Sequence, residues 1–334
     1  QDADQDGRDR HDRQHRDRVE GGVRLWIVGM EAAQRPTVLP LRLETGIDEP
    51  AQILSDLVDG EQPLVHPEQS HERGLVVLAL AGGDYVTEIV RELGQGTPII
   101  IMHGLFGSSD NWLTQARMLS STYHVFSLDL RNHGQSPHDD KFDYPVMLED
   151  LKNFIDEHNL SDPIVMGHSM GGKVAMNFAL AHPDLLSKLI VVDIAPKPYN
   201  LEHYVILDGL KAIPIDRLSS RTEADEILSG FVPEPDVRQF LLKNLQRRQE
   251  GGFAWKINLS AVDKKLPNIG VDLEEKGIFK NPTLFIRGLN SSYIRETDFD
   301  RIKLIFPSAV IESLDTGHWV QAEKPKAFVE LVEE

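Results

Sequence analysis

The stretch "PIVMGHSMGGKVAMNFAL", residues 163–180, decides the fold, because a glycine-flanked serine joins an apolar strand to a helix of small and apolar residues. Its centre, "GHSMG" at 167–171, has the pattern G-x-S-x-G. Glycines flank the serine because the chain must turn so sharply that Ser169 adopts a strained backbone, with its Oγ projecting above the sheet. The pentapeptide alone occurs often by chance, but the strand before it and the helix after it make the signal specific. Ser169 is therefore the candidate nucleophile.

The same residues also fit a phosphate-binding loop. "GHSMGGK" at 167–173 matches G-x-x-x-x-G-K, and Asp193 at the end of "LIVVD" could pass for the acid that holds Mg²⁺. The next position decides between the two interpretations. A phosphate loop needs Ser or Thr there to bind Mg²⁺, whereas this chain has Val174. We therefore favour the serine nucleophile and expect no metal at this site.

Strands alternate with helices on both sides of the serine. Apolar strands are predicted at "PIIIMHG", "HVFSLDL", "PIVMGHS", "LIVVDIA", "PTLFIRG" and "AVIESLD", and a hairpin of "LVVLAL" and "YVTEIVREL" precedes them. In the predicted helix "PVMLEDLKNFIDEHNL", Met147, Leu151, Phe154 and Ile155 have the spacing of one buried face. Strands alternating with helices of this length predict an α/β fold with a mostly parallel central sheet and helices on both faces.

The alternation breaks at Pro196. Residues 197 to about 272 are mostly helical in pattern and contain no strong strand, so we expect a helical lid, inserted after the sixth strand, above the strand ends. The catalytic domain with its lid then spans 75–334. Before it we expect a charged, disordered extension at 1–20, for which a His-containing metal tract is the alternative, and a segment at 21–74 to which no chemistry is assigned.

Composition limits the class of protein. The 334 residues are 40% hydrophobic, which is enough for a proper core, and the formal net charge of −18 argues against a nucleic-acid-binding surface. With no cysteine in the chain, disulfides and Cys nucleophiles are excluded. No apolar run approaches the ~20 residues of a membrane span. Residues 1–20 have the features of neither a signal nor a transit peptide, so we expect a cytoplasmic protein without a membrane segment.

A serine hydroxyl is a weak nucleophile unless a base takes its proton. His318 in "LDTGHWV" is the candidate base, because it follows a strand near the C-terminal end, the chain order expected after such a serine turn. The alternative for His318 is a loop histidine bonded to backbone. His168 beside the serine points elsewhere on so tight a turn, and His103 is more typical of a structural loop histidine.

The tetrahedral intermediate of acyl transfer needs two backbone N–H donors aimed at its oxyanion. One is expected from Met170, the residue after the nucleophile. The other is expected from the loop after the first parallel strand, where "HGLFG" at 103–107 places glycines around Leu105 and Phe106. We predict that Leu105 and Met170 form the oxyanion hole.

Together these residues resemble the α/β-hydrolase superfamily, and more narrowly the YbfF-type small carboxylesterases. The shared stretches are "HGLFGSSDNW" (103–112), "DLRNHGQSPH" (129–138), "GHSMGGK" (167–173), "VVDIAP" (191–196), "FIRGLNSSYI" (285–294) and "GHW" (317–319). The resemblance covers roughly residues 87–334, about three-quarters of the chain. It implies an α/β-hydrolase fold and a Ser-His-acid triad beneath a helical lid.

The acid of the triad is missing from its usual place. In most of the superfamily an Asp follows the strand matching "TLFIRG", but the loop here runs "LNSSYIR" before the first acid, Glu296. The resemblance implies that YbfF-type enzymes take the acid from one strand earlier, where Asp193 stands, with a serine in the vacated site. The neighbouring strand end can reach the same nitrogen of His318. Ser291 would then support the carboxylate or the ring by a hydrogen bond.

Other carboxylates compete with Asp193 for this role. Asp315 is close to His318 in sequence but is expected to cap the turn. Glu296 and Asp298 are expected to start the next helix, where acids favour the N-terminal dipole. Asp263 lies in the returning part of the lid, away from any strand end.

The resemblance implies a carboxylesterase that acts on small acyl esters without a cofactor or metal. For its substrate pocket we expect Phe106, Trp255 and Trp319. Thioester hydrolysis, C–C bond hydrolysis and perhydrolysis are alternatives that use the same triad, and a non-catalytic binding protein with this fold is the alternative from another class. The expected partner is a small-molecule ester, not nucleic acid or membrane, and no oligomeric state is predicted.

Overall fold

The structure is a computed structural model that describes residues 89–200 and 203–334. The described residues form a seven-stranded sheet in the order β1-β3-β2-β4-β5-β8-β9. Its strands are β1 (Ile89–Leu93), β2 (Thr97–Met102), β3 (Tyr123–Asp129), β4 (Ile164–His168), β5 (Lys188–Val192), β8 (Thr283–Gly288) and β9 (Ala309–Leu314). The expected strand at 75–80 and the segments assigned to 1–20 and 21–74 lie outside the described residues.

The sheet is mostly parallel, as predicted. β1 pairs antiparallel with β3, and every other neighbouring pair is parallel. In the register, His168 at the end of β4 pairs with Val192 at the end of β5, and Val192 pairs with Ile286 of β8. The carboxyl ends of these three strands therefore meet at one edge, where α/β sheets hold their sites.

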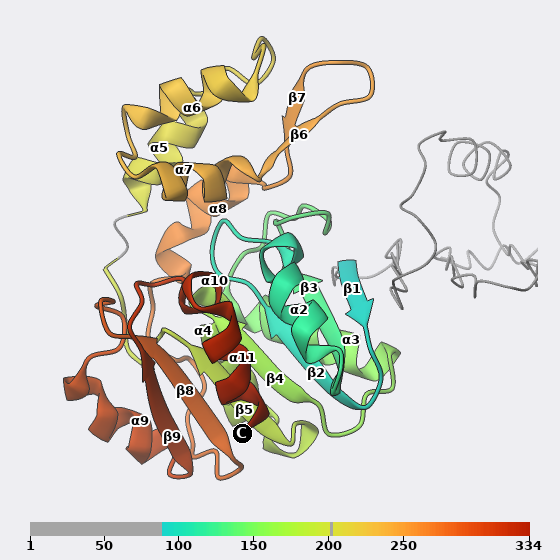
Figure 1. Ribbon diagram of the computed structural model, residues 1–334, viewed down its shortest axis with the longest axis vertical. Helices are drawn as coiled ribbons and strands as arrows, with labels where there is room; N and C mark the ends of the chain where they lie inside the picture. Colours follow the sequence, from blue (N-terminus) through green and yellow to red (C-terminus); the bar gives the residue numbers. More distant parts are fainter. Residues whose placement is uncertain (1–88, 201–202) are drawn as a thin grey trace, which may run out of the picture.

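Helices cover both faces of the sheet, and the alternation of side chains along each strand decides which face they bury. Along β2, Ile99 and Ile101 pack with α2 (Leu113–Leu119) and α11 (Pro325–Glu333), which Figure 1 shows in front of the strands. Ile100 and Met102 point to the opposite face and pack with α3 (Tyr144–Glu157) and α4 (Met170–Ala181). All four side chains are fully buried, so both faces of this strand belong to the core.

The remaining helices on the sheet agree with the predicted order. They are α3 (Tyr144–Glu157), α4 (Met170–Ala181), α9 (Phe299–Ile305) and α10 (Val320–Glu323), with 3-10 turns at Ser109–Trp112, Pro183–Leu185 and Glu296–Asp298. α3 begins one residue before the predicted Pro145, because the Asp143 carboxylate caps it by accepting the N–H of Val146 at 3.2 Å. None of the helices within the described ranges is long and apolar enough to cross a membrane.

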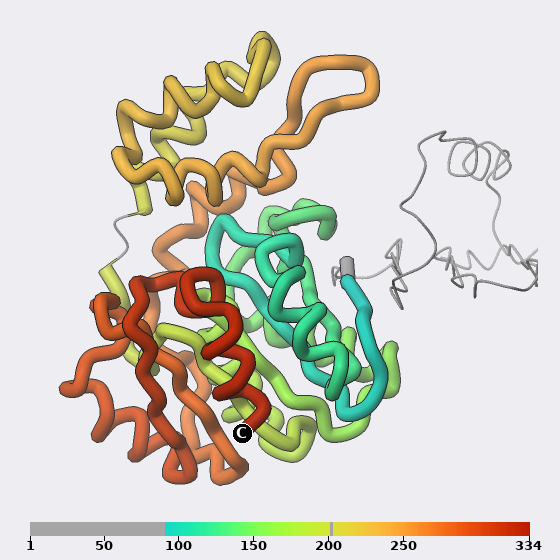
Figure 2. The backbone as a smooth tube through the Cα atoms, in the orientation of Figure 1, coloured from blue at the N-terminus to red at the C-terminus, as the bar shows by residue number. Residues whose placement is uncertain are grey.

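The segment between β5 and β8 leaves the body of the molecule and returns to it, as the yellow-to-orange part of Figure 2 shows. It holds α5 (Tyr204–Ala212), α6 (Arg221–Ser229), α7 (Pro235–Leu242), β6 (Leu245–Arg247), β7 (Phe253–Trp255), α8 (Leu259–Lys265) and a 3-10 turn at Leu266–Asn268. No strong strand was expected here, and the two strands that the segment holds, β6 and β7, are three residues each and form an antiparallel hairpin. The segment follows the fifth described strand; the predicted count of six includes the strand at 75–80.

Candidate active site

Ser169 stands at the turn between β4 and α4. Its backbone lies in the left-handed half of conformational space, with φ 53° and ψ −116°. The flanking glycines allow this turn because there is no room for a side chain at either position. A Cβ on Gly167 would lie 2.2 Å from the carbonyl oxygen of Gly171, and one on Gly171 would lie 2.6 Å from that of Met102. The G-x-S-x-G pattern thus follows from close backbone packing.

Asp193 occupies the corresponding position at the end of β5. The strand pairing continues to the two polar residues, because the Ser169 N–H donates to the Val192 carbonyl at 3.0 Å and the Asp193 N–H donates to the Ile286 carbonyl at 2.8 Å. Asp193 also has a positive φ, 48°, and is fully buried. Adjacent parallel strands therefore present a serine and a carboxylate side by side above the sheet.

The structure brings Asp193 and His318 together. The Nδ1 of His318 lies 2.7 Å from Oδ2 of Asp193. The Ser291 hydroxyl also donates to Oδ2, and the Gly288 N–H donates to Oδ1 at 3.0 Å. Because both carboxylate oxygens accept hydrogen bonds, the buried charge is compensated and the carboxylate is held in one orientation.

The competing carboxylates have other partners. Asp315 is exposed and accepts a hydrogen bond from the Asn290 side chain at 3.0 Å. Glu296 lies 3.7 Å from Arg287, and Asp263 lies 3.0 Å from Lys211. The Asp298 carboxylate accepts a hydrogen bond from the N–H of Arg295 at 2.8 Å. Among the described residues, Asp193 is the carboxylate on the His318 ring.

The His318 ring is held on further sides. The Tyr293 ring stacks on it, with centroids 3.9 Å apart and planes 16° from parallel. His168 lies with its ring centroid 4.5 Å away and donates from Nε2 to the His318 carbonyl at 2.9 Å. The hydrogen bonds of the described residues include none between Ser169 Oγ and His318; such bonds often tighten only when substrate binds.

The loop after β2 contains Leu105, one of the two residues predicted to donate to the oxyanion. Phe106 has a φ of 63°, and its N–H is taken by Nε2 of His133 at 3.2 Å. The N–H of Phe106 is therefore not available to a ligand. Leu105 is the residue of this loop that lines the same pocket as Ser169, together with Met170 at the start of α4. The first N–H groups of a helix have no partner within the helix, so that of Met170 is available to a ligand.

Buried neutral histidines support this loop. Burial lowers the pKa of His103 to about 4 and that of His133 to about 3. His103 accepts the Leu130 N–H at Nε2 and donates from Nδ1 to the Gly104 carbonyl. The motif "DLRNHGQSPH" does not reveal the role of His133, because only the fold brings this residue to the loop after β2.

Comparison with known proteins identifies the family of this chain. Residues 97–212 match the family model described as the alpha/beta hydrolase fold. Esterase YbfF of Escherichia coli is 35% identical over 238 residues, which cover 71% of this chain and 91% of that protein. The chain belongs to the α/β-hydrolase family. The hydrolase is also 38% identical to a Danio rerio protein named sn-1-specific diacylglycerol lipase ABHD11 over 245 residues, 71% of this chain and 77% of that one.

The solved structures extend this likeness to three dimensions. The hydrolase superposes on a marine microorganism esterase with a TM-score of 0.72 at 40% identity, over 74% of this chain and 98% of that one. The predicted family and the predicted resemblance to YbfF-type esterases are thus confirmed.

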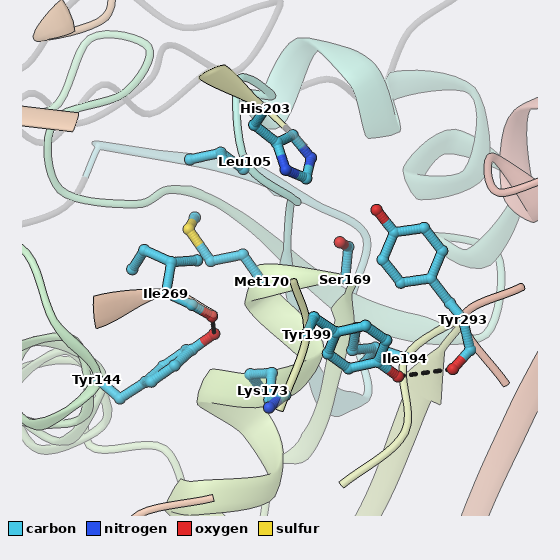
Figure 3. A pocket seen from close by; sticks show the side chains of 10 residues that line it. All are labelled: Leu105, Tyr144, Ser169, Met170, Lys173, Ile194, Tyr199, His203, Ile269 and Tyr293. Carbon is cyan, nitrogen blue, oxygen red and sulfur yellow. Dashed lines mark hydrogen bonds between the residues drawn. The ribbon is translucent and has the colours of Figure 1, made fainter. Parts of the chain in front are cut away.

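A pocket opens above the serine of this hydrolase. Figure 3 shows the Ser169 hydroxyl pointing into the space between His203 and Tyr293. The lining is mostly apolar and consists of Leu105, Tyr144, Ser169, Met170, Lys173, Ile194, Tyr199, His203, Ile269 and Tyr293. Of the residues predicted to bind substrate or hold the oxyanion, Leu105 and Met170 belong to this lining.

The three aromatic residues predicted for the pocket are not part of its lining. The positive φ of Phe106 places its side chain in the core, where it is buried. Trp319 packs against Phe240 of the lid, with ring centroids 5.5 Å apart. Trp255 stands on the hairpin strand β7 and packs against the main core. Their part in binding substrate stays a prediction; Phe106 lies beside the lining residue His203, with ring centroids 6.0 Å apart.

Lys173 is a lining residue that the sequence analysis missed. Its ammonium group donates to the carbonyl oxygens of Lys197 and Val271, at 2.6 Å each. Burial lowers its pKa to about 8. Because Lys197 and Val271 lie at the two ends of the segment between β5 and β8, this side chain of α4 ties both ends to the helix that follows the serine. Within the described residues no cluster of acidic and histidine side chains could hold a metal ion.

Proposed function

We propose that this hydrolase is a serine carboxylesterase that cleaves small acyl esters, with Ser169, His318 and Asp193 as its triad. The observation that carries the proposal is the hydrogen bond of 2.7 Å between Asp193 and the ring of His318, at the strand edge that also presents Ser169. Esterase names among relatives of 35% identity and more support the same reaction class.

Acylation begins when His318 takes the proton of Ser169 and Oγ attacks the ester carbonyl. The histidine acts through Nε2, because Asp193 fixes the proton on Nδ1, and the carboxylate stabilises the imidazolium that forms. The N–H groups of Leu105 and Met170 donate to the oxyanion of the tetrahedral intermediate. The imidazolium then protonates the alkoxide, and the alcohol leaves.

Deacylation repeats these steps with water. His318 takes a proton from water, the hydroxide attacks the acyl-enzyme carbonyl, and Ser169 recovers its proton as the acid departs. Ser291 supports the acid in both halves of the reaction, since its hydroxyl donates to the same Oδ2 that faces His318. Every proton transfer in the two half-reactions passes through His318.

The substrate is a small molecule whose acyl group fits an apolar pocket. The lining side chains of Leu105, Met170, Ile194 and Ile269 offer apolar contacts to a short hydrocarbon chain. A second candidate substrate is an acylglycerol, which the name of the Danio rerio relative favours. Thioester and C–C bond hydrolysis use the same triad, but no feature of the pocket favours them.

The first prediction concerns the nucleophile. Replacing Ser169 with Ala removes the attacking oxygen, so kcat on p-nitrophenyl acetate should fall by about 10⁶. A fluorophosphonate probe should label the wild-type protein at Ser169 and leave Ser169→Ala unlabelled. Hydrolysis that survives Ser169→Ala would contradict the proposed mechanism, and a wild-type protein that resists the probe would favour a binding protein.

A panel of p-nitrophenyl esters and diacylglycerols would then separate the two candidate substrate classes, small acyl esters and acylglycerols.

A further inference from the structure

Tyr293 holds a position against His318 that the mechanism above does not use. It lies in the loop after β8, in the stretch that replaces the usual acid of the family. Its ring is nearly parallel to the His318 ring at a centroid distance of 3.9 Å, and it also lines the pocket beside Ser169 (Figure 3). Asp193 contacts the same imidazole at its edge, through Nδ1. One imidazole is therefore held at its edge by a carboxylate and on its face by an aromatic ring.

The backbone of Tyr293 is fixed from both sides. Its N–H donates to Oγ of Ser291 at 3.2 Å, and its carbonyl accepts the Tyr199 hydroxyl at 2.6 Å. The Tyr199 hydroxyl in turn accepts the N–H of Ala195 at 2.8 Å. Ser291 also donates to the Asp193 carboxylate, and Ala195 lies two residues after Asp193 in the chain. The carboxylate and the stacked ring therefore belong to one hydrogen-bonded unit.

The π face of an aromatic ring attracts a cation that lies over it. His318 becomes a cation only when it has taken the proton of Ser169, so this attraction is greater in the transition state than in the free enzyme. We propose that Tyr293 is a positioning residue, which holds the imidazole plane toward Ser169 and stabilises the imidazolium by stacking. The inference rests on the proposed esterase mechanism and deepens it.

The other titratable groups near His318 do not supply this effect. Burial lowers the pKa of His203 to about 4 and that of His168 well below its ordinary value, so both rings are neutral at neutral pH. Glu323 accepts the N–H of Gly317 in the loop before His318. The negative partner of the ring itself is Asp193, and its aromatic partner at stacking distance is Tyr293.

The test is the pH dependence of kcat/KM in the full chain with p-nitrophenyl acetate. Tyr293→Leu keeps apolar cover over the imidazole but removes the π face, so the ring should accept its proton only at a lower pH. The midpoint of the acidic limb should move down by about half a pH unit, and kcat should fall about threefold to tenfold. Tyr293→Phe keeps the stacked ring and should restore the wild-type position of the limb.

Two controls make the result decisive. Tyr123→Leu changes a tyrosine at the amino end of β3, opposite the site, and should leave the limb unmoved. If Tyr293→Leu does not fold, Tyr293→Met removes the same π face with a more adaptable side chain. An acidic limb that stays in place while KM rises would show that Tyr293 is only a wall of the pocket. That result, with Ser169 still essential, overturns this inference alone; activity without Ser169 overturns the esterase proposal itself.

Discussion

Asp193 combines full burial, a positive φ and three hydrogen-bond donors on one carboxylate. These contacts fix the orientation of the carboxylate, because a buried charge is tolerated only when its oxygens accept hydrogen bonds. Ser291 and the Gly288 N–H complete that pairing from β8 and the loop after it. Two neighbouring strand ends thus hold one carboxylate.

Replacing Asp193 with Asn tests the acid assignment at the scale of one residue. The uncharged amide does not stabilise the imidazolium, and its NH₂ group can donate to Nδ1 and hold the wrong tautomer, so kcat should fall by about 10⁴ with little change in the fold. Asp315→Asn is the matched control, because that carboxylate is exposed and bonds Asn290. If the Asp315 variant loses activity and the Asp193 variant does not, the acid is misassigned.

At the scale of elements, the turn from β4 into α4 depends on backbone contact between neighbouring segments. Gly171 lies against the carbonyl oxygens of Met102 and His103, at the end of β2, and these atoms cannot move without shifting the loop that follows β2. The serine turn and the loop after β2 are therefore packed directly against each other, and a change in one displaces the other.

Gly171→Ala should for this reason lower both stability and activity. The added Cβ would meet backbone at 2.6 Å, and we expect a loss of about 1–3 kcal/mol in the free energy of unfolding, measured by urea titration. Gly230→Ala is the control, because a Cβ added at Gly230 would lie 3.5 Å from its nearest neighbour, the Ile227 carbonyl oxygen, and the φ of Gly230 is −70°. Equal stability losses in the two variants would contradict the close packing.

The strongest sequence patterns were local ones. The β4 strand, the serine turn and helix α4 could be predicted because residues 163–180 specify them without distant contacts. The three-residue strands β6 and β7 could not, since they are too short to show a period of two. The roles of Tyr293, Lys173 and His133 could not be predicted either, because they depend on contacts between segments far apart in the chain.

At the scale of the whole molecule, buried neutral histidines couple folding to pH. The pKa of His103 is about 4 and that of His133 about 3 in the folded protein, against 6.5 for an exposed histidine. The unfolded chain therefore binds protons that the folded protein does not. This contribution to stability is complete above pH 6.5 and is lost as the pH falls toward 4.

The free energy of unfolding should accordingly decrease from pH 7 to pH 5, before most carboxylates titrate. For His103 alone the full effect, a pKa fall from 6.5 to about 4, corresponds to about 3 kcal/mol. Urea titrations at half-unit steps of pH measure it. In His133→Gln one proton-binding group is gone, so the slope should be shallower; a wild-type curve that is flat over this range contradicts the coupling.

The attachment of the segment between β5 and β8 has a consequence for substrate choice. Leu189 of β5 pairs directly with Thr283 of β8, so the two strands are neighbours in the sheet although the segment separates them in the chain. Lys173 of α4 donates to the first and last parts of the segment, at Lys197 and Val271. Because His203 and Ile269 of this segment line the pocket, we expect an exchange of the segment that keeps both ends to change which esters fit.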